Sequence, residues 1–170
     1  MRTPRLKQIR KLMKRLVKVG FRAPFNILAD HHFLVAFHNS QMETKVIEHI
    51  LDGPIRLWTT SCEYKKFKEQ VSGFKLIGNT RLAKCTHKDF RTLECLKEAI
   101  ETDNPHHYFL AISPKFRKLR SEKNVPIIFM RSGVLCVEIG EEHDEAIKEK
   151  ELTPGLSEKE KAALSQMFGE

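Results

Sequence analysis

A series of short apolar runs constrains the fold of this chain more than any other feature. Each run is rich in β-branched or aromatic residues, and the stretches between them, at 43–52, 63–84 and 92–103, have the composition of helices. Continuous apolar strands that alternate with helices are typical of parallel pairing in a sheet buried on both faces. We therefore predict a three-layer α/β/α domain with a mostly parallel central sheet. The predicted strands are "FNILAD" (25–30), "IRLWTT" (55–60), "HYFLAI" (107–112), "PIIFM" (126–130) and "VLCVEI" (134–139).

A length of 170 residues, 41% of them hydrophobic, suits one globular domain with short appendages. We assign the domain to residues 21–140, a basic amphipathic N-terminal helix to 1–20 and a charged, mostly acidic C-terminal tail to 141–170. The sequence has no apolar run of about 18 residues or more, and its N-terminus has no uncharged apolar region, so neither a membrane span nor a secretory signal is predicted. We expect an intracellular protein with no membrane contact.

The excess positive charge of the chain lies in residues 1–20. This segment contains no acid, and its basic side chains account for the whole formal net charge of +8. Its apolar residues recur at helical spacing, which predicts a cationic amphipathic helix. The helix could contact RNA phosphates, lie on a membrane surface or serve as a presequence, or pack on its own domain with a solvated basic face. A presequence is disfavoured because the segment has no serine. The apolar residues are Leu6, Ile9, Met13, Leu16 and Val17, and the candidate RNA-binding residues are Arg2, Arg5, Lys7, Arg10, Lys11, Lys14, Arg15 and Lys18.

The stretch "AKCTHKDFRTLEC" (83–95) brings Cys85, His87 and Cys95 close together in the sequence. Cysteine and histidine bind zinc, and a tetrahedral zinc ion needs four ligands. In a chain without a secretory signal, cysteines are more often reduced thiols or metal ligands than disulfide partners. A fourth ligand must then come from elsewhere in the chain. The alternative is that these isolated cysteines are buried core residues.

The ends of the predicted strands suggest where that fourth ligand lies. In an open parallel sheet, ligands bind beyond the carboxyl ends of the strands. Asp30 ends the first predicted strand, Cys62 follows the second and Ser113 follows the third. If these ends converge, Cys62 completes a Cys3His set for one structural Zn(2+). The predicted ligands are Cys62, Cys85, His87 and Cys95.

Several segments together carry a family resemblance: "GFRAPFNILAD", "TTSC", "KCTHKDFRTLEC", "NPHHYFLA" and "VPIIF", in this order. The chain, from about Leu6 to Glu138, resembles the PIN-like processing factors of the eukaryotic small-subunit processome. The resemblance implies a PIN-like α/β/α fold with an embedded CCHC zinc finger whose ligands fall on the same four residues. It also implies early pre-rRNA processing and small-subunit ribosome biogenesis in the nucleus and nucleolus. The implied partners are pre-rRNA, a small nucleolar RNA and small-subunit processome proteins.

PIN nucleases cut RNA with Mg²⁺ or Mn²⁺ ions held by several carboxylates. By the resemblance, this chain keeps Asp30 and Glu94 at acid positions. It has Lys66 where active members have an acid, and residues 113–115 read "SPK" where another aspartate is expected. Two carboxylates and an inward lysine hold a divalent ion poorly. We therefore predict a degenerate PIN nuclease that acts as a non-catalytic RNA-binding assembly factor.

The alternative is a Mg/Mn-dependent PIN endoribonuclease that acts on pre-rRNA. A shift of one turn in the helix after the second strand would bring Glu63 or Glu69 into the acidic site. The remaining conspicuous residues are assigned ordinary roles. His31 and His32 are expected in a loop, His106 and His107 in turn contacts, Trp58, Phe109 and Phe129 in the core, and Cys136 in a buried strand.

Overall fold

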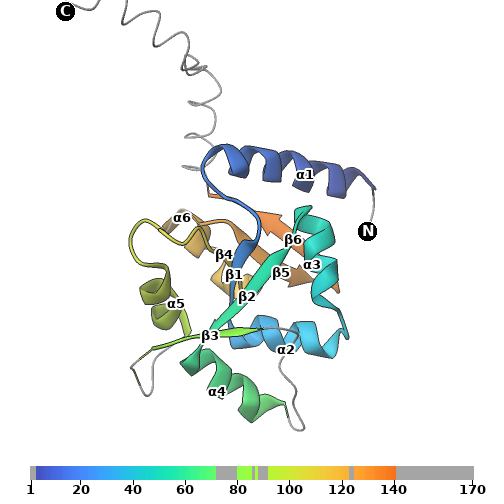
Figure 1. Cartoon of the computed structure of the whole chain (residues 1–170). Helices are drawn as coiled ribbons and strands as arrows, with labels where there is room; N and C mark the ends of the chain where they lie inside the picture. The colour runs from blue at the N-terminus through green and yellow to red at the C-terminus, as the bar shows by residue number, and fades with distance from the viewer. Residues whose placement is uncertain (1–2, 72–79, 86, 88–91, 123–124, 141–170) are drawn as a thin grey trace, which may run out of the picture.

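The computed structural model describes residues 3–71, 80–85, 87, 92–122 and 125–140 (Figure 1). A six-stranded sheet in the order β3-β2-β1-β4-β5-β6 forms its centre. The strands are β1 (Phe25–Ala29), β2 (Ile55–Thr60), β3 (Arg81–Ala83), β4 (Phe109–Ala111), β5 (Ile127–Arg131) and β6 (Val134–Glu138). The helices are α1 (Thr3–Lys18), α2 (His31–Asn39), α3 (Thr44–Leu51), α4 (Ser61–Gln70), α5 (Thr92–Ile100) and α6 (Leu119–Glu122), with a 3-10 turn η1 (Pro114–Phe116).

The strand pairing confirms the predicted fold class. Strands β3, β2, β1, β4 and β5 pair in parallel, and β6 pairs antiparallel with β5. Ser132 and Gly133 join β5 to β6, and both have positive φ, at 49° and 72°. Two such residues form the tight turn that matches the twist of a hairpin. The sheet is therefore mostly parallel, with one antiparallel edge.

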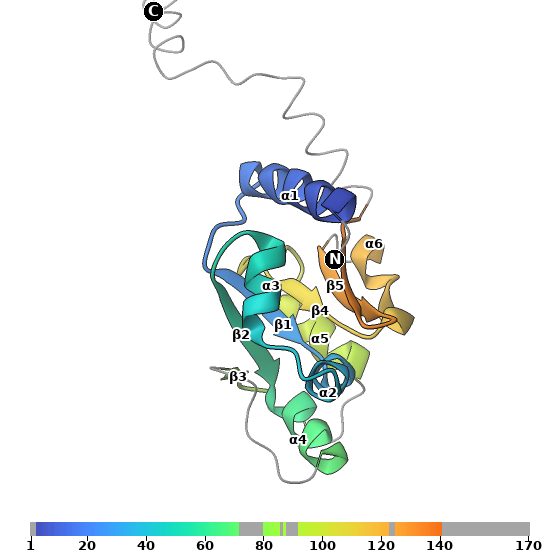
Figure 2. The same cartoon turned by 90° about the vertical axis from the view of Figure 1, so that its right-hand side faces the viewer.

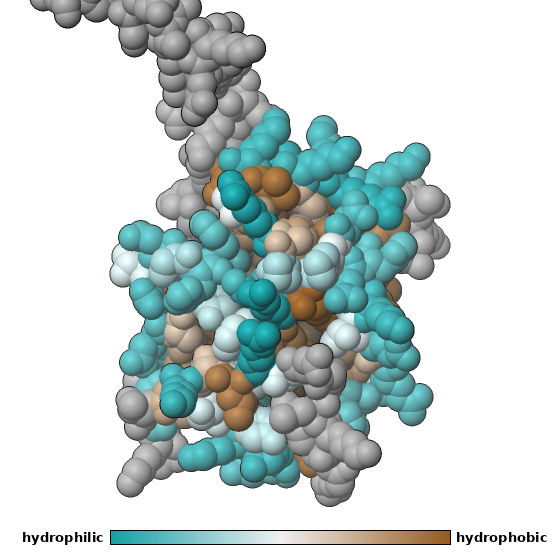
Figure 3. Space-filling view, in the orientation of Figure 1, coloured by the Kyte–Doolittle hydropathy of each residue, from teal (hydrophilic) through white to brown (hydrophobic). Residues whose placement is uncertain are grey.

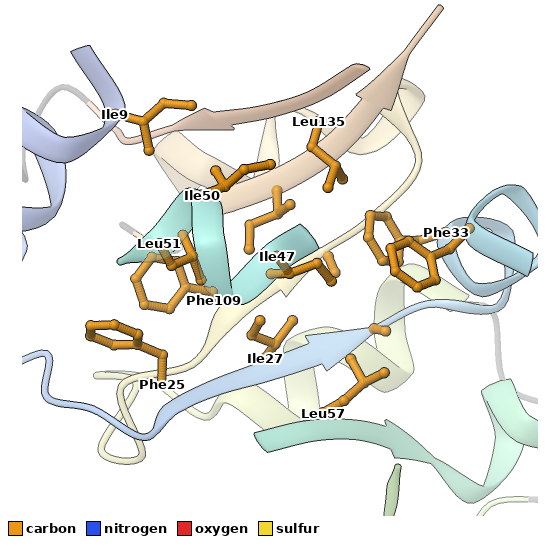
Figure 4. Close-up of a cluster of buried hydrophobic side chains, with 14 of the residues drawn as sticks. Ile9, Phe25, Ile27, Phe33, Ile47, Ile50, Leu51, Leu57, Phe109 and Leu135 are labelled. Atoms are coloured by element: carbon orange, nitrogen blue, oxygen red, sulfur yellow. The ribbon is translucent and has the colours of Figure 1, made fainter. Parts of the chain in front are cut away.

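Alternating side chains of the central strands bury both faces of the sheet. In β1, Ile27 and Ala29 join one hydrophobic cluster, whereas Leu28 joins the other. The first cluster contains side chains of α1, α2 and α3 (Figure 4), and the second contains side chains of α5 and α6. Figure 1 shows the sheet between α5 and α6 on one side and α2 and α3 on the other. This arrangement is the three-layer architecture that continuous apolar strands indicate.

Helix α1 packs on the domain through its apolar face. Ile9, Met13 and Leu16 are buried in the first cluster, which also contains residues of α3. Val17, which is predicted to lie on the apolar face, is instead 48% exposed. In both views α1 lies across one end of the domain (Figures 1 and 2). The basic side of the helix therefore faces away from the core, and Figure 3 shows mainly hydrophilic residues on that side of the molecule.

Two segments differ from the sequence prediction. The stretch 63–84 is not one helix, because α4 ends at Gln70 and residues 81–83 form β3 beside β2; residues 72–79 lie outside the described part. A strand of three residues, two of them with exposed side chains, leaves no alternating pattern in the sequence. His31 and His32 are not in a loop but begin α2. Asp30 caps this helix, and Phe33, Leu34 and Phe37 bury its apolar face.

Candidate functional site

The carboxyl ends of β1 and β4 meet at the point where the strand order reverses. Strands β2 and β3 lie on one side of β1, and β4, β5 and β6 lie on the other. Such a switch point is where α/β sheets bind ligands. Asp30 follows β1 there, and its backbone N–H donates to Ala111 O of β4 at 2.9 Å. Helices α2 and α4 lie side by side at this end of the sheet (Figures 1 and 2).

Asp30 is fully buried, and backbone groups bind both of its carboxylate oxygens. Phe33 N–H donates to Oδ1 at 2.6 Å, which caps α2, and Ser113 N–H donates to Oδ2 at 3.0 Å. Burial raises the pKa of Asp30 to about 6, although these hydrogen bonds lower it. The Glu63 charge adds to the increase. Glu63 also accepts a hydrogen bond from the backbone N–H of His31, the residue after Asp30, so the two acids lie in one pocket.

Glu63, in the first turn of α4, is the second acid of this pocket and is also fully buried. Its Oε2 accepts from the His31 backbone N–H at 3.0 Å and lies 2.5 Å from His31 Nδ1. Lys66 Nζ donates to Oε1 at 3.0 Å and to Thr92 Oγ1 at 3.2 Å. Burial raises the pKa of Glu63, but the hydrogen bonds of His31 and Lys66 outweigh it and hold the pKa at about 2. Glu63 is therefore ionised, and the Lys66 ammonium group compensates its charge.

The position of Glu94 differs from the prediction that pairs it with Asp30. Its side chain is exposed in the first turn of α5, and the acid next to Asp30 is Glu63 instead. Lys66 does point into the pocket, but its ammonium group binds Glu63. The sequence does contain a signal for Glu63: Thr60 and Glu63 have the spacing of a capping box, and Glu63 N–H donates to Thr60 Oγ1. That motif starts α4 at Ser61 and places Glu63 in the first turn of the helix.

The structure brings together the four predicted metal ligands. Cys62 lies in the first turn of α4, Cys85 follows β3 and Cys95 lies in α5. The ligand atoms of these cysteines and His87 all lie within 4.8 Å of one another. Cys62 Sγ is 3.4 Å from Cys85 Sγ and 3.1 Å from His87 Nδ1. Ligand atoms of a tetrahedral zinc ion lie about 3.5 to 3.8 Å apart, so shifts of up to about 1 Å would bring these four ligand atoms to the spacing that zinc requires.

Further hydrogen bonds orient these ligands. Glu98 Oε2 lies 2.6 Å from His87 Nε2, which leaves His87 Nδ1 directed at the cysteines. A carboxylate on the second nitrogen is the usual way to orient a metal-binding histidine. Thr60 Oγ1 lies 3.1 Å from Cys95 Sγ. Burial raises the pKa of the Cys95 thiol to about 12, because the charged thiolate is disfavoured in a buried site. A bound metal cation would have the opposite effect and favour the thiolate.

The acidic pocket and the Cys3His cluster share two helices. Helix α4 carries Cys62 next to Glu63, and α5 carries Thr92 one turn before Cys95. Thr92 Oγ1 binds Lys66 and lies 3.4 Å from His31 Nδ1. A metal that joined α4 to α5 would also hold Thr92 close to Lys66.

The predicted RNA-binding residues are partly described. Lys7, Arg10, Lys11, Lys14 and Lys18 have exposed side chains on α1, and Arg15 is half-buried. Arg10 also approaches Asp52 at the end of α3, at 3.9 Å. Arg2 and the side chain of Arg5 lie outside the described part of the chain.

The residues with ordinary predicted roles are mostly buried. Phe109, Phe129 and Cys136 are core residues, and Trp58 is half-buried against the second cluster. His106 and His107 make the expected turn contacts: His106 O accepts from Asn26 Nδ2, and the His107 ring packs on Phe21. None of the described helices is long and apolar enough to cross a membrane.

Comparison with known proteins identifies the class of fold and then the family. The fold is that of a PIN domain: the structure of the PIN domain endonuclease Utp24 superposes with a TM-score of 0.55 at 14% identity, over 70% of this chain and 95% of that one. Residues 49–139 match the Fcf1 family model, and the chain belongs to the Fcf1 family. It is also 28% identical, over 183 residues, to the rRNA-processing protein utp23 of Schizosaccharomyces pombe, across 97% of this chain and 69% of that protein. The predicted family resemblance is therefore confirmed.

Proposed function

We propose that this protein is a non-catalytic RNA-binding assembly factor of the small-subunit processome. It acts in early pre-rRNA processing and small-subunit ribosome biogenesis, in the nucleus and nucleolus. Its partners in this role are pre-rRNA, a small nucleolar RNA and small-subunit processome proteins. The similarity to the rRNA-processing protein utp23 and membership in the Fcf1 family support the pathway.

The charge arrangement in the acidic pocket carries the non-catalytic assignment. A hard divalent ion that activates water needs several free carboxylate oxygens. In the described pocket both oxygens of Asp30 accept backbone hydrogen bonds, and both oxygens of Glu63 are bound by His31 and Lys66. The Lys66 ammonium group supplies the positive charge that a catalytic ion would otherwise bring. The pocket is thus an internally compensated structural element.

An RNA cleavage assay tests this assignment. Single-stranded RNA is incubated with Mn²⁺ and either the parent protein or Asp30→Asn, after each preparation is freed of contaminating nuclease. We expect no metal-dependent cleavage by the parent above that of the variant. Cleavage by the parent that disappears in Asp30→Asn would overturn the proposal.

That outcome would favour the second candidate, a Mg/Mn-dependent PIN endoribonuclease that acts on pre-rRNA. The observation in its favour is the pair of fully buried acids, Asp30 and Glu63, at the switch point of a PIN fold. Lys66→Ala adds a direct check, since this variant frees Glu63 from its ammonium partner. If Lys66→Ala gains Mn²⁺-dependent cleavage while the parent has none, the fold can support nuclease activity and Lys66 prevents that activity in the parent.

The proposal includes one structural Zn(2+) at Cys62, Cys85, His87 and Cys95. The mutual distances of the four ligand atoms and the Glu98 contact to His87 support it. Zinc would supply the cross-link between α4, the residues after β3, and α5. A closed site with four protein ligands has no open position for substrate, so its role is structural.

We assign phosphate contacts to the basic face of α1. Its apolar face is buried, so the exposed lysines are presented on a fixed helix. Replacing Lys7, Lys11 and Lys14 together with glutamine removes three candidate phosphate contacts. The slope of log affinity against log salt for single-stranded RNA should fall by about 2, since each contact contributes about 0.7. Unchanged affinity and slope would make α1 a packing helix only.

A further inference from the structure

We infer that a basic hollow formed by η1 and α6 is a second RNA-phosphate site, which continues the basic surface of α1 toward the acidic pocket. The hollow has a volume of about 610 Å³. Its lining includes Lys115, Arg117, Lys118 and Arg120. Four cations on one short segment form the kind of electropositive groove that follows a nucleic-acid backbone. The inference rests on the proposed RNA-binding function and extends it to another surface.

The cations of the hollow divide into two pairs. Arg117 and Arg120 both donate to the carboxylate of Glu138 at the end of β6. This ion pairing orients their guanidinium groups, which remain 43% and 32% exposed. Lys115 and Lys118 are exposed. Among the described residues that line or contact the hollow, one carboxylate pairs with two of the four cations, and these residues together carry a net positive charge.

Glu138 also connects the hollow to α1. A second groove, of about 410 Å³, lies between α1 and β6, and its lining includes Lys11, Arg15 and Glu138 beside apolar residues of both elements. Because Glu138 borders this groove and binds Arg117 and Arg120, the two cavities adjoin. Helix α6 lies below α1 in both views (Figures 1 and 2). One extended strand of RNA can therefore contact α1 and the hollow together.

The other end of the hollow reaches the acidic pocket. Lys115 Nζ donates to His32 Nε2 at 2.8 Å, and the His32 ring lies 3.9 Å from the ring of His31, which binds Glu63. An ammonium group has three donors, so Lys115 keeps donors for a phosphate. His32 and Phe116, with ring centroids 6.2 Å apart, place half-buried aromatic rings beside Lys115. Cations next to aromatic rings favour single-stranded RNA over an acidic peptide, because RNA bases stack on aromatic rings while RNA phosphates form ion pairs with the cations.

The test compares RNA binding by four forms of the full chain. A fluorescent single-stranded oligoribonucleotide of mixed sequence is titrated at several salt concentrations. Lys115→Ala with Lys118→Ala removes two cations of the hollow. Lys115→Arg with Lys118→Arg keeps their charge. Lys45→Ala with Arg56→Ala is the matched control, since both residues are exposed, lie on α3 and β2, and account for the same change in net charge.

We expect the alanine pair in the hollow to weaken binding several-fold at low salt and to lower the salt slope by about 1.4, the value for two lost phosphate contacts. The arginine pair should bind like the parent, and the control should change neither quantity by more than a small fraction. Melting temperatures of all forms should agree, because the altered side chains are exposed.

Two outcomes would overturn the inference. The first is RNA binding by the hollow variant equal to that of the control, with the parent still binding RNA; this leaves the proposed function intact. The second is a polyglutamate peptide whose binding depends on Lys115 and Lys118 while RNA binding does not. A parent protein that binds no RNA at all would instead overturn the proposed function itself.

Discussion

Asp30 is subject to two opposing effects. Burial disfavours its charge, while two backbone N–H groups favour it, and the balance leaves its pKa raised from 3.8 to about 6. The buried side chain therefore holds its proton to a higher pH in the folded protein than in the unfolded chain. The Asp30 carboxylate caps α2 and accepts a hydrogen bond from the backbone after β4. A change in the protonation of Asp30 therefore affects the contacts that join α2 to the end of β4.

Asp30 should make stability fall as the pH rises from about 4 to about 6. Because the folded pKa is the higher one, its contribution is fully present below the unfolded pKa of 3.8 and is lost as the pH passes the folded pKa of about 6. The loss corresponds to about 3 kcal/mol. Urea unfolding of the parent and Asp30→Asn across this range measures it. The stability of the parent relative to the variant should decrease with pH, and a constant difference would contradict the prediction.

Two buried cysteines of similar exposure allow a matched test of the zinc proposal. Cys95, 1% exposed, belongs to the Cys3His cluster, whereas Cys136, 4% exposed, lies in β6 within the second hydrophobic cluster. Cys95→Ser should lower the zinc content of the purified protein from one per chain to near zero. Cys136→Ser should keep its zinc and lose roughly 1 kcal/mol of stability through packing alone. Metal analysis of both variants decides; equal zinc contents would count against the assigned ligands.

At the scale of elements, α1 combines a buried face with a charged one. Leu16 is fully buried and packs in the core cluster shared with α3, while its neighbour Val17 is 48% exposed. The helix is thus held by apolar contacts, and its basic side chains remain available for other partners. Its folding and its proposed RNA contacts depend on different residues.

Leu16→Ala should reduce the free energy of unfolding by about 2 to 5 kcal/mol, because it removes buried methyl groups and leaves a cavity. Val17→Ala, on the same helix, should change it by less than about 0.5 kcal/mol. Chemical denaturation gives both values. Similar effects of the two substitutions would mean that α1 does not pack through the face described.

For the whole molecule, the main consequence of the Cys3His cluster is to join separate parts of the domain. Helix α4 follows β2, α5 precedes β4, and β3 lies at the sheet edge with exposed side chains. A short exposed edge strand buries little apolar surface of its own. A metal bound by residues from all three segments would supply the stability that packing does not.

Zinc removal should therefore lower the melting temperature of the parent. Structural zinc sites in small peptides contribute on the order of 10 kcal/mol of apparent binding free energy, so a strong chelator should have a clear effect. Cys95→Ser is the control, since it should already lack the metal and should melt at the same temperature with or without chelator. Calorimetry measures the melting temperature of each protein with and without chelator. If the parent contains bound zinc but its melting temperature does not change when the chelator removes the zinc, the stabilising role is contradicted.

The sequence by itself determined the class of fold and predicted four candidate metal ligands, whose ligand atoms the structure places within 4.8 Å of one another. Continuous apolar runs at 25–30 and 55–60 are typical of a sheet covered by helices on both faces. The position of Cys62 at a strand end predicted that it would lie near Cys85, His87 and Cys95. Composition and periodicity are local properties of the chain, so the features that depend on them could be predicted from the sequence. The basic face of the first helix was visible for the same reason.

The tertiary structure decided which acid joins Asp30 and where the shortest strand lies. Glu63 and Glu94 are both in the first turn of a helix, and only the relative placement of α4 and α5 turns Glu63 inward and leaves Glu94 exposed. Strand β3 exists because β2 offers it backbone partners, a contact between distant segments. Burial and pairing across the chain depend on the packed arrangement of elements, which no local pattern contains.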